Sequence, residues 1–207
     1  MRQKADKQDY KARLDALYLP RLAEHGLGPQ AQGWPSRLEQ MVRFAALTGI
    51  GLSPGDSVLD AGCGQGDLLK HLEEQGFQGR YFGIDLLPEM IETATDLRPP
   101  PGIDACFAVA DLADAPRHWR ADVVLASGIF VVMTQDEAQA ALAQLFAACR
   151  RAFAFTCLSS WDPTPNAEGY LRLDPAETLN FCRSLTPRVL LRHEYFLTDF
   201  TVYLYRE

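Results

Sequence analysis

From residue 57 onward, short apolar runs alternate with segments that have helical periodicity. Five apolar runs occupy residues 57–62, 80–86, 103–112, 121–130 and 151–160. Amphipathic segments lie between them at residues 67–76, 88–97 and 136–150. Strands that are buried on both faces appear as continuous apolar runs, and parallel strands require a crossover that is usually a helix. The pattern therefore predicts an α/β fold with a parallel sheet.

The last part of the chain has a different pattern. A helix is expected at residues 175–185, followed by two β patterns at 188–196 and 200–206. Only residues 197–199 separate these two strands, which is too short for a crossover helix, so they must be antiparallel neighbours. We therefore expect a doubly wound, Rossmann-like sheet of seven strands, mostly parallel, with an antiparallel last strand.

Residues 1–50 precede this alternation and contain the helical stretch 37–49 and an irregular segment at 26–36. They have too few apolar residues to form a core of their own. We interpret them as a helical cap on a core at residues 51–207. The 207 residues then form a single domain, 1–207, which suits a chain of this length.

Composition and charge narrow the class of protein. The formal net charge is -7, so the chain has no basic field with which to bind long nucleic acid. The start of the sequence is polar and no run of about 18 apolar residues occurs, so we expect a cytoplasmic protein outside the membrane. The 5 cysteines and 4 histidines are scattered without metal-ligand spacing, which predicts reduced thiols and no metal. The sequence does not indicate an oligomeric state.

The segment LDAGCGQGD, residues 59–67, places three glycines at the turn between the first strand and the first helix. Such a turn is typical of sites where a ligand approaches the backbone closely. The dinucleotide fingerprint would need a glycine at Asp67, and so would the phosphate-binding loop. A carboxylate at that position repels phosphate at the helix N-terminus, so the sequence argues against both.

The pattern D-x-G-x-G-x-G at residues 60–66 resembles motif I of the class I methyltransferases that use S-adenosylmethionine (SAM). The resemblance covers about residues 40–207. It implies that Asp85 binds the ribose hydroxyls, that Asp111 binds the adenine, and that Ser127 closes strand four under SAM. The cofactor-binding residues implied in this way are Arg43, Asp60, Ala61, Gly62, Cys63, Gly64, Gly66, Asp85, Leu86, Ala110, Asp111, Leu112 and Ser127.

Several of these residues have a structural alternative. Asp85 could cap the helix that begins at Pro88, and Asp111 could be a helix cap or lie in a solvated loop. Arg43 either meets the SAM carboxylate or lies on a solvated helix face. His193 lies in an apolar strand pattern, which favours a core histidine over a catalytic base.

Methyl transfer from SAM mainly requires alignment and exclusion of water, so catalytic residues need leave no signature and none is assigned. The irregular loop 159–174 is long enough to be a lid. We expect a small-molecule acceptor against Trp34, Phe130, Trp161 and Tyr170, unless these residues only pack the loop onto the body. Two other hypotheses remain: a non-catalytic SAM-binding sensor or partner subunit, and a nicotinamide oxidoreductase.

Overall fold

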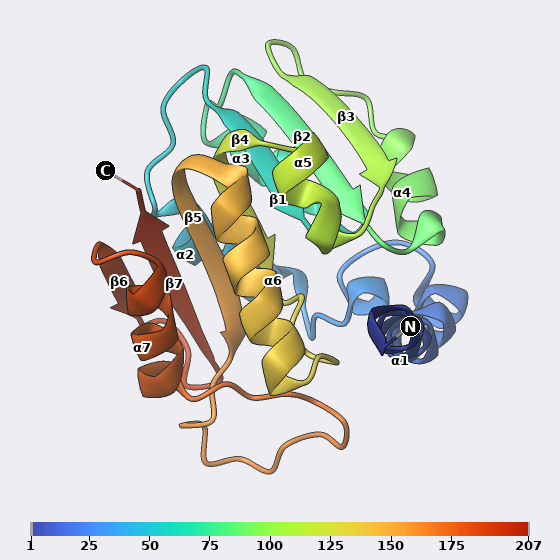
Figure 1. Ribbon diagram of the computed structural model, residues 1–207. Helices are drawn as coiled ribbons and strands as arrows, with labels where there is room; N and C mark the ends of the chain where they lie inside the picture. Colours follow the sequence, from blue (N-terminus) through green and yellow to red (C-terminus); the bar gives the residue numbers. More distant parts are fainter. Residues whose placement is uncertain (1, 207) are drawn as a thin grey trace.

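A seven-stranded sheet forms the centre of the computed structural model, which describes residues 2–206 (Figure 1). The strand order is β3-β2-β1-β4-β5-β7-β6, and β7 is antiparallel to both of its neighbours. The predicted α/β sheet with one reversed strand is therefore confirmed. The strands are β1 Ser57–Ala61, β2 Arg80–Asp85, β3 Asp104–Val109, β4 Ala121–Ser127, β5 Cys149–Leu158, β6 Val189–Arg192 and β7 Asp199–Tyr205.

Helices cover both faces of the sheet because buried side chains alternate along the central strands. In β4, Val123 and Leu125 pack with the helices α2 and α3, whereas Val124 and Ala126 pack with α5, α6 and α7. Figure 1 shows α5 and α6 in front of the sheet. The helices are α1 Arg2–His25, α2 Arg37–Thr48, α3 Asp67–Glu74, α4 Pro88–Thr95, α5 Ala115–His118, α6 Gln135–Ala148 and α7 Pro175–Leu185, with short 3-10 helices η1 Gln30–Gln32 and η2 Leu112–Asp114.

All seven predicted strands end earlier than the sequence indicated, and two of them show how this arises. The apolar run 121–130 leaves the sheet after Ser127, because Gly128 has a φ of 69° and turns the chain. The run 188–196 pairs only up to Arg192. The first boundary was wrong because Ile129 and Phe130 continue the apolar run after the turn, and the second because Tyr195 and Phe196 follow beyond the end of the pairing.

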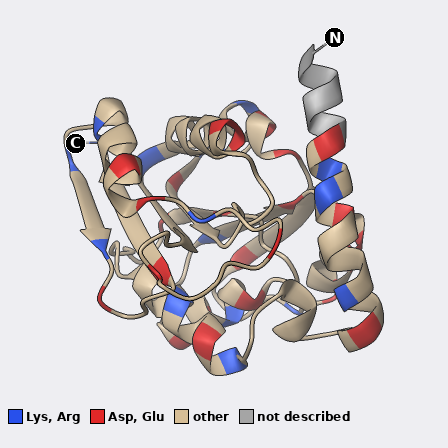
Figure 2. Ribbon diagram, turned by 90° about the horizontal axis from the view of Figure 1, so that it is seen from below, with Lys and Arg blue, Asp and Glu red and all other residues tan. Residues whose placement is uncertain are grey.

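The N-terminal segment divides into two parts. α2 packs on the sheet with Phe44 and Leu47 buried, so it is one of the covering helices of the core. α1 instead crosses the edge where β1, β2 and β4 end, close to the loop 159–174 (Figures 1 and 2). The expected helical cap over this edge thus consists of α1 and the segment that follows it.

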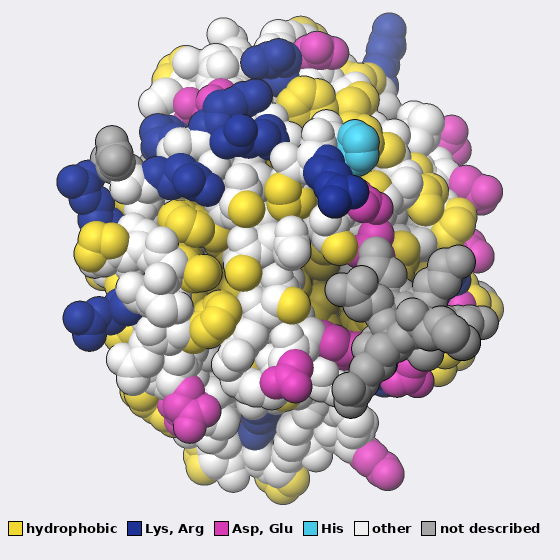
Figure 3. All heavy atoms as spheres, in the orientation of Figure 1, with side chains coloured by type: hydrophobic (Ala, Val, Ile, Leu, Met, Phe, Trp, Pro, Cys, Tyr) yellow, Lys and Arg dark blue, Asp and Glu magenta, His cyan; other side chains and the backbone are white. Residues whose placement is uncertain are grey.

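The charged surface is uneven. Positively charged side chains gather on the upper part of the face shown in Figure 3. The exposed Arg120 and Arg150 lie at the amino ends of β4 and β5, on the side opposite α1. Within residues 2–206, no helix combines the length and apolar character needed to cross a bilayer.

One carboxyl group lies within the sheet. Asp60 of β1 is 3% exposed and accepts a hydrogen bond from the hydroxyl of Tyr81 on the neighbouring strand β2. Burial raises the pKa of Asp60 from 3.8 to about 7, although the Tyr81 hydrogen bond acts in the opposite direction. Proton binding to Asp60 is therefore coupled to folding.

We predict that Asp60→Asn removes a pH-dependent part of the stability. Because the folded pKa lies above the unfolded value, this contribution is complete below pH 3.8 and is lost as pH rises through about 7. Between about pH 5 and pH 8, the unfolding free energy of the wild type should fall by roughly 1 to 3 kcal/mol relative to D60N. Urea unfolding at each pH measures this difference. The exposed control D104N should keep the wild-type slope, and equal slopes for wild type and D60N would contradict the prediction.

Candidate functional site

A cavity of about 930 Å³ lies at the edge of the sheet where the parallel strands end. The turns after β1, β2, β3 and β4 form one side of it. α1 and the loop 159–174 form the other side. Its volume lies at the upper end of the roughly 300 to 1,000 Å³ of typical ligand sites, and its place outside the carboxyl ends is where ligands bind in open α/β sheets.

The turn after β1 favours glycine at three positions, Gly62, Gly64 and Gly66, of which the first two line the cavity. Gly62 and Gly64 have φ values of 76° and 53°, a region that is unfavourable for residues with a Cβ. A Cβ at Gly62 would also lie 2.3 Å from Cγ2 of Ile129. The N–H groups of Gly62 and Cys63 both donate to the carbonyl of Ile84, at 2.8 and 3.0 Å. The turn is therefore fixed against the end of β2.

Asp85, at the end of β2, faces this turn. Its Oδ2 accepts a hydrogen bond from the N–H of Gly64 at 3.0 Å, and its Oδ1 accepts one from the N–H of Leu87 at 3.0 Å. The helix α4 has Leu87 as its N-cap, so the alternative in which Asp85 caps this helix is wrong. Burial raises the pKa of Asp85, and the backbone N–H groups oppose that shift. Its carboxyl group lines the cavity.

Asp111 follows β3 and also lines the cavity, together with Leu112. Its Oδ1 accepts a hydrogen bond from the N–H of Ala113 at 2.8 Å, and it is the N-cap of η2. The helix-cap alternative for Asp111 is thus confirmed. Asp111 caps η2 and still lines the cavity, so the capping role is compatible with ligand binding.

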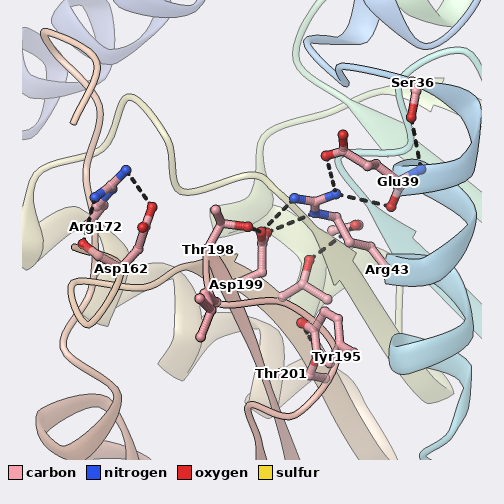
Figure 4. A network of polar contacts seen from close by, with 12 residues as sticks. Ser36, Glu39, Arg43, Asp162, Arg172, Tyr195, Thr198, Asp199 and Thr201 are labelled. Atoms are coloured by element: carbon pink, nitrogen blue, oxygen red, sulfur yellow. Dashed lines mark hydrogen bonds and ion pairs between the residues drawn. The ribbon is translucent and has the colours of Figure 1, made fainter. Parts of the chain in front are cut away.

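Arg43 of α2 is buried, at 4% exposure, which excludes the solvated helix face (Figure 4). Its Nε and Nη2 donate to the two carboxyl oxygens of Asp199 at 2.8 and 2.5 Å, and Nη1 donates to the carbonyl of Glu39 at 3.0 Å. The guanidinium lies 5.2 Å from the ring centroid of Trp34 and 4.8 Å from that of Phe196. The bidentate pair with Asp199 fixes the Arg43 side chain at the cavity wall.

The structure brings together most of the residues expected from the sequence. From the expected cofactor set, the cavity wall contains Arg43, Gly62, Cys63, Gly64, Asp85, Leu86, Asp111, Leu112 and Ser127. From the expected substrate set it contains Trp34 and Tyr170. Four expected cofactor residues lie outside the wall: Asp60, Ala61, Gly66 and Ala110. Asp60 points into the layer between sheet and helices, where it bonds Tyr81, so it does not reach the cavity.

Two expected substrate residues are placed elsewhere. Phe130 is 1% exposed and packs edge-on against Phe155, with ring centroids 5.5 Å apart, so it belongs to the core. Trp161 is 54% exposed, and its indole N–H donates to Asp174 at 3.1 Å. Neither residue lines the cavity. Phe130 therefore packs within the core, whereas Trp161 lies at the surface beside Asp174 and His193. His193 is half-buried, contacts Trp161 and the buried Phe200, and lies outside the cavity wall.

Sequence reasoning missed the contribution of α1. Tyr10, Leu14 and Tyr18 follow one another at intervals of four residues, and together with Arg21 they line the cavity. The i, i+4, i+8 spacing was a visible signal, because it places these side chains on one face of a helix. The loop 159–174 adds Arg172, which forms an ion pair with Asp162 at 2.8 Å.

The cavity offers no obvious general base. Its wall contains neither histidine nor lysine within the part of the chain that the structure describes. Most of its carboxylates already accept hydrogen bonds from the protein: Glu137 from Arg13 and the Thr134 N–H, and Asp162 from Thr164. Among the side chains that the structure describes, no group of three or more potential metal ligands occurs. The arrangement is suited to binding and alignment.

Comparison with known proteins agrees with this geometry. A family model described as a methyltransferase domain matches residues 58–152. The Mycobacterium tuberculosis (strain H37Rv) protein Rv1506c, whose name describes it as a methyltransferase, is 37% identical over 155 residues, which are 70% of this chain and 90% of that protein.

Solved structures show the same fold. Magnesium protoporphyrin IX methyltransferase from Synechocystis PCC 6803, determined with bound SAM, has a TM-score of 0.69 at 20% identity, over 98% of this chain and 97% of that one. The plantazolicin methyltransferase BpumL was determined with a triazolic desmethyl analogue and S-adenosylhomocysteine (SAH). It has a TM-score of 0.66 at 16% identity, over 97% of this chain and 99% of that one. At these identities the likeness concerns the fold alone.

The Arg43–Asp199 pair joins α2 to β7, and we predict that breaking it on one side is costly. Asp199→Ala leaves a buried guanidinium without its main partner, which should lower the unfolding free energy by about 3 to 5 kcal/mol. The double variant R43M/D199L replaces the pair with apolar groups and should recover most of that loss. Urea unfolding measures both variants. A double variant as unstable as D199A would show that the cost does not come from an uncompensated charge.

Proposed function

This chain belongs to the class I SAM-dependent methyltransferases, and we propose that it transfers the methyl group to a small molecule bound in the cavity described above. One observation supports the proposal most: a single cavity contains the glycine turn at one wall and α1 with the loop 159–174 at the other. Cofactor and acceptor can therefore share one space that the protein encloses.

The part of the cavity wall formed by the glycine turn after β1 is better suited to SAM than to a dinucleotide. The N–H of Gly64 already donates to Asp85, so it is not available to a pyrophosphate. Asp67 occupies the first turn of α3, where it pairs with Arg37 at 2.7 Å. Carboxylates at these positions repel phosphate but tolerate the ammonium and sulfonium charges of SAM.

We assign the cofactor-binding residues accordingly. Asp85 would accept hydrogen bonds from the ribose hydroxyls, and Asp111 with Leu112 would hold the adenine. Arg43, fixed by Asp199, would meet the carboxylate of the methionine portion. Gly62 and Gly64 would form the backbone wall beside the methionine portion, in a turn where a Cβ would collide with Ile129 or Gln32.

SAM supplies a methyl group that its sulfonium already activates, so the protein mainly has to hold the acceptor in line and keep water out. α1 and the loop 159–174 cover the cavity and are joined by the hydrogen bond from Arg21 to the Tyr170 hydroxyl at 2.6 Å. The described wall contains no histidine or lysine, so a proton acceptor from the protein would have to be one of its carboxylates.

A small molecule is favoured because the acceptor side of the cavity is covered by protein and the charge of the chain is unfavourable for long nucleic acid. Two proteins of similar fold are named for small acceptors, a magnesium porphyrin and the natural product plantazolicin. These names support the proposal by analogy of fold.

We predict that the protein binds SAM and SAH, and that Asp85→Asn weakens SAM binding by about tenfold or more. The loss of charge weakens the charge-assisted hydrogen bonds to the ribose. Calorimetric titration measures the affinity. The exposed Asp96→Asn, at the end of α4, is the matched control and should bind SAM as the wild type does. Unchanged affinity in D85N would remove Asp85 from the site, and binding of NADH in preference to SAM would reject the cofactor assignment.

We also predict catalytic turnover with small metabolites. A cell extract should be separated by dialysis into a small-molecule fraction and a protein fraction, and SAH formation from SAM measured with each. Turnover is expected with the small-molecule fraction. Turnover with the protein fraction alone would contradict a small acceptor. Tight SAM binding without turnover in either fraction would favour the non-catalytic sensor.

A further inference from the structure

The acceptor side of the cavity contains a cation without an acidic partner. Arg21 of α1 is partly buried and lines the cavity, yet it forms no ion pair within the residues that the structure describes. Its Nη2 donates to the hydroxyl of Tyr170 at 2.6 Å. Its Nη1 lies near Gly33, where a Cβ would be only 2.5 Å away. The hydrogen bond to Tyr170 thus orients the guanidinium, and Gly33 leaves the space that Nη1 occupies.

The other arginines of the wall are different. Arg43 is paired with Asp199, and Arg172 with Asp162, so their charges are compensated. Arg117 has no ion pair but is exposed to solvent, where its charge is hydrated. A partly buried guanidinium without a counter-charge is costly unless a ligand supplies one. Arg21 is therefore distinguished by burial together with an uncompensated charge.

Three phenol groups lie on the same side of the cavity. Tyr10 and Tyr18 line the wall, and their hydroxyls form no hydrogen bond within the described residues. Burial raises the pKa of both, with further contributions from Asp85 and other neighbours, so at neutral pH both hydroxyls carry a proton to donate. Tyr170 accepts from Arg21, so its own hydroxyl hydrogen is also available. The hydroxyls of Tyr10, Tyr18 and Tyr170 can therefore donate to a bound ligand.

We propose that Arg21, with the hydroxyls of Tyr18 and Tyr170, binds a carboxylate group of the methyl acceptor. This inference rests on the proposed function and names the chemical class of the acceptor. A carboxylate can accept two or more hydrogen bonds and carries the single charge that compensates one guanidinium. The carboxylate anchors the acceptor against α1, so that another part of the molecule extends toward the glycine turn.

A phosphate fits less well at the same place. Asp85 lies close enough to affect the pKa of both Tyr10 and Tyr18, and Glu137 affects that of Tyr10. These carboxylates would repel a dianion more strongly than a monoanion. One arginine and phenol donors compensate one negative charge, which favours the carboxylate.

Binding to the SAH complex tests the proposal. The probes are benzoate and cinnamate, each compared with its neutral amide, in calorimetric titrations of protein saturated with SAH. We expect each carboxylate to bind about tenfold more tightly than its amide, because the amide lacks the charge. Arg21→Gln should abolish this preference, Arg21→Lys should keep part of it, and Tyr170→Phe should weaken carboxylate binding by severalfold.

Arg183→Gln is the matched control, because Arg183 is exposed on α7 and lies outside the cavity wall. It should keep the wild-type preference, and R21Q should still bind SAH as the wild type does, which shows that the variant is folded. Equal binding of acid and amide, a preference that persists in R21Q, or no binding of either acid at millimolar concentration would overturn the inference. If the wild type fails to bind SAH itself, the proposed function is overturned first.

Discussion

The site depends on the hydrogen bond from the N–H of Gly64 to the carboxylate of Asp85. Because β1 and β2 are parallel neighbours, the turn after β1 and the residue that ends β2 lie side by side. The bond fixes the left-handed turn at Gly64 and uses the N–H that a phosphate would otherwise take. The same interaction therefore shapes the cavity and selects against one class of ligand.

The fold could be predicted because its signals are local. Seven apolar runs mark the strands, and the short segment 197–199 alone determines that β7 is antiparallel to β6. Strand ends were less predictable, since Gly128 turns the chain while apolar residues continue. The role of α2 was also missed, because the burial of Phe44 and Leu47 depends on a sheet that forms from later residues.

Residues of the site could be predicted from the sequence only where they lie at the ends of strands. Asp85 and Asp111 lie at the carboxyl ends of predicted β runs, so their position at the carboxyl edge follows from topology. The contact between Arg21 and Tyr170 joins residues 149 positions apart, and no local pattern indicates such a pairing. The position of Trp161 could not be predicted for the same reason. Its indole N–H bonds Asp174 at the surface, and the aromatic character of the residue alone does not indicate this contact.

The distribution of charge across the cavity bears on how the reaction is accelerated. On the glycine side, Asp85 and Asp111 favour a cationic ligand, and this attraction weakens once the methyl group has left and the thioether is neutral. An interaction that stabilises the bound cofactor more than the transition state tightens binding but does not lower the barrier. Acceleration must therefore come mainly from holding the acceptor in line. The residues able to do so are those of α1 and the loop 159–174, which face the glycine turn across the cavity and include Arg21 and Tyr170.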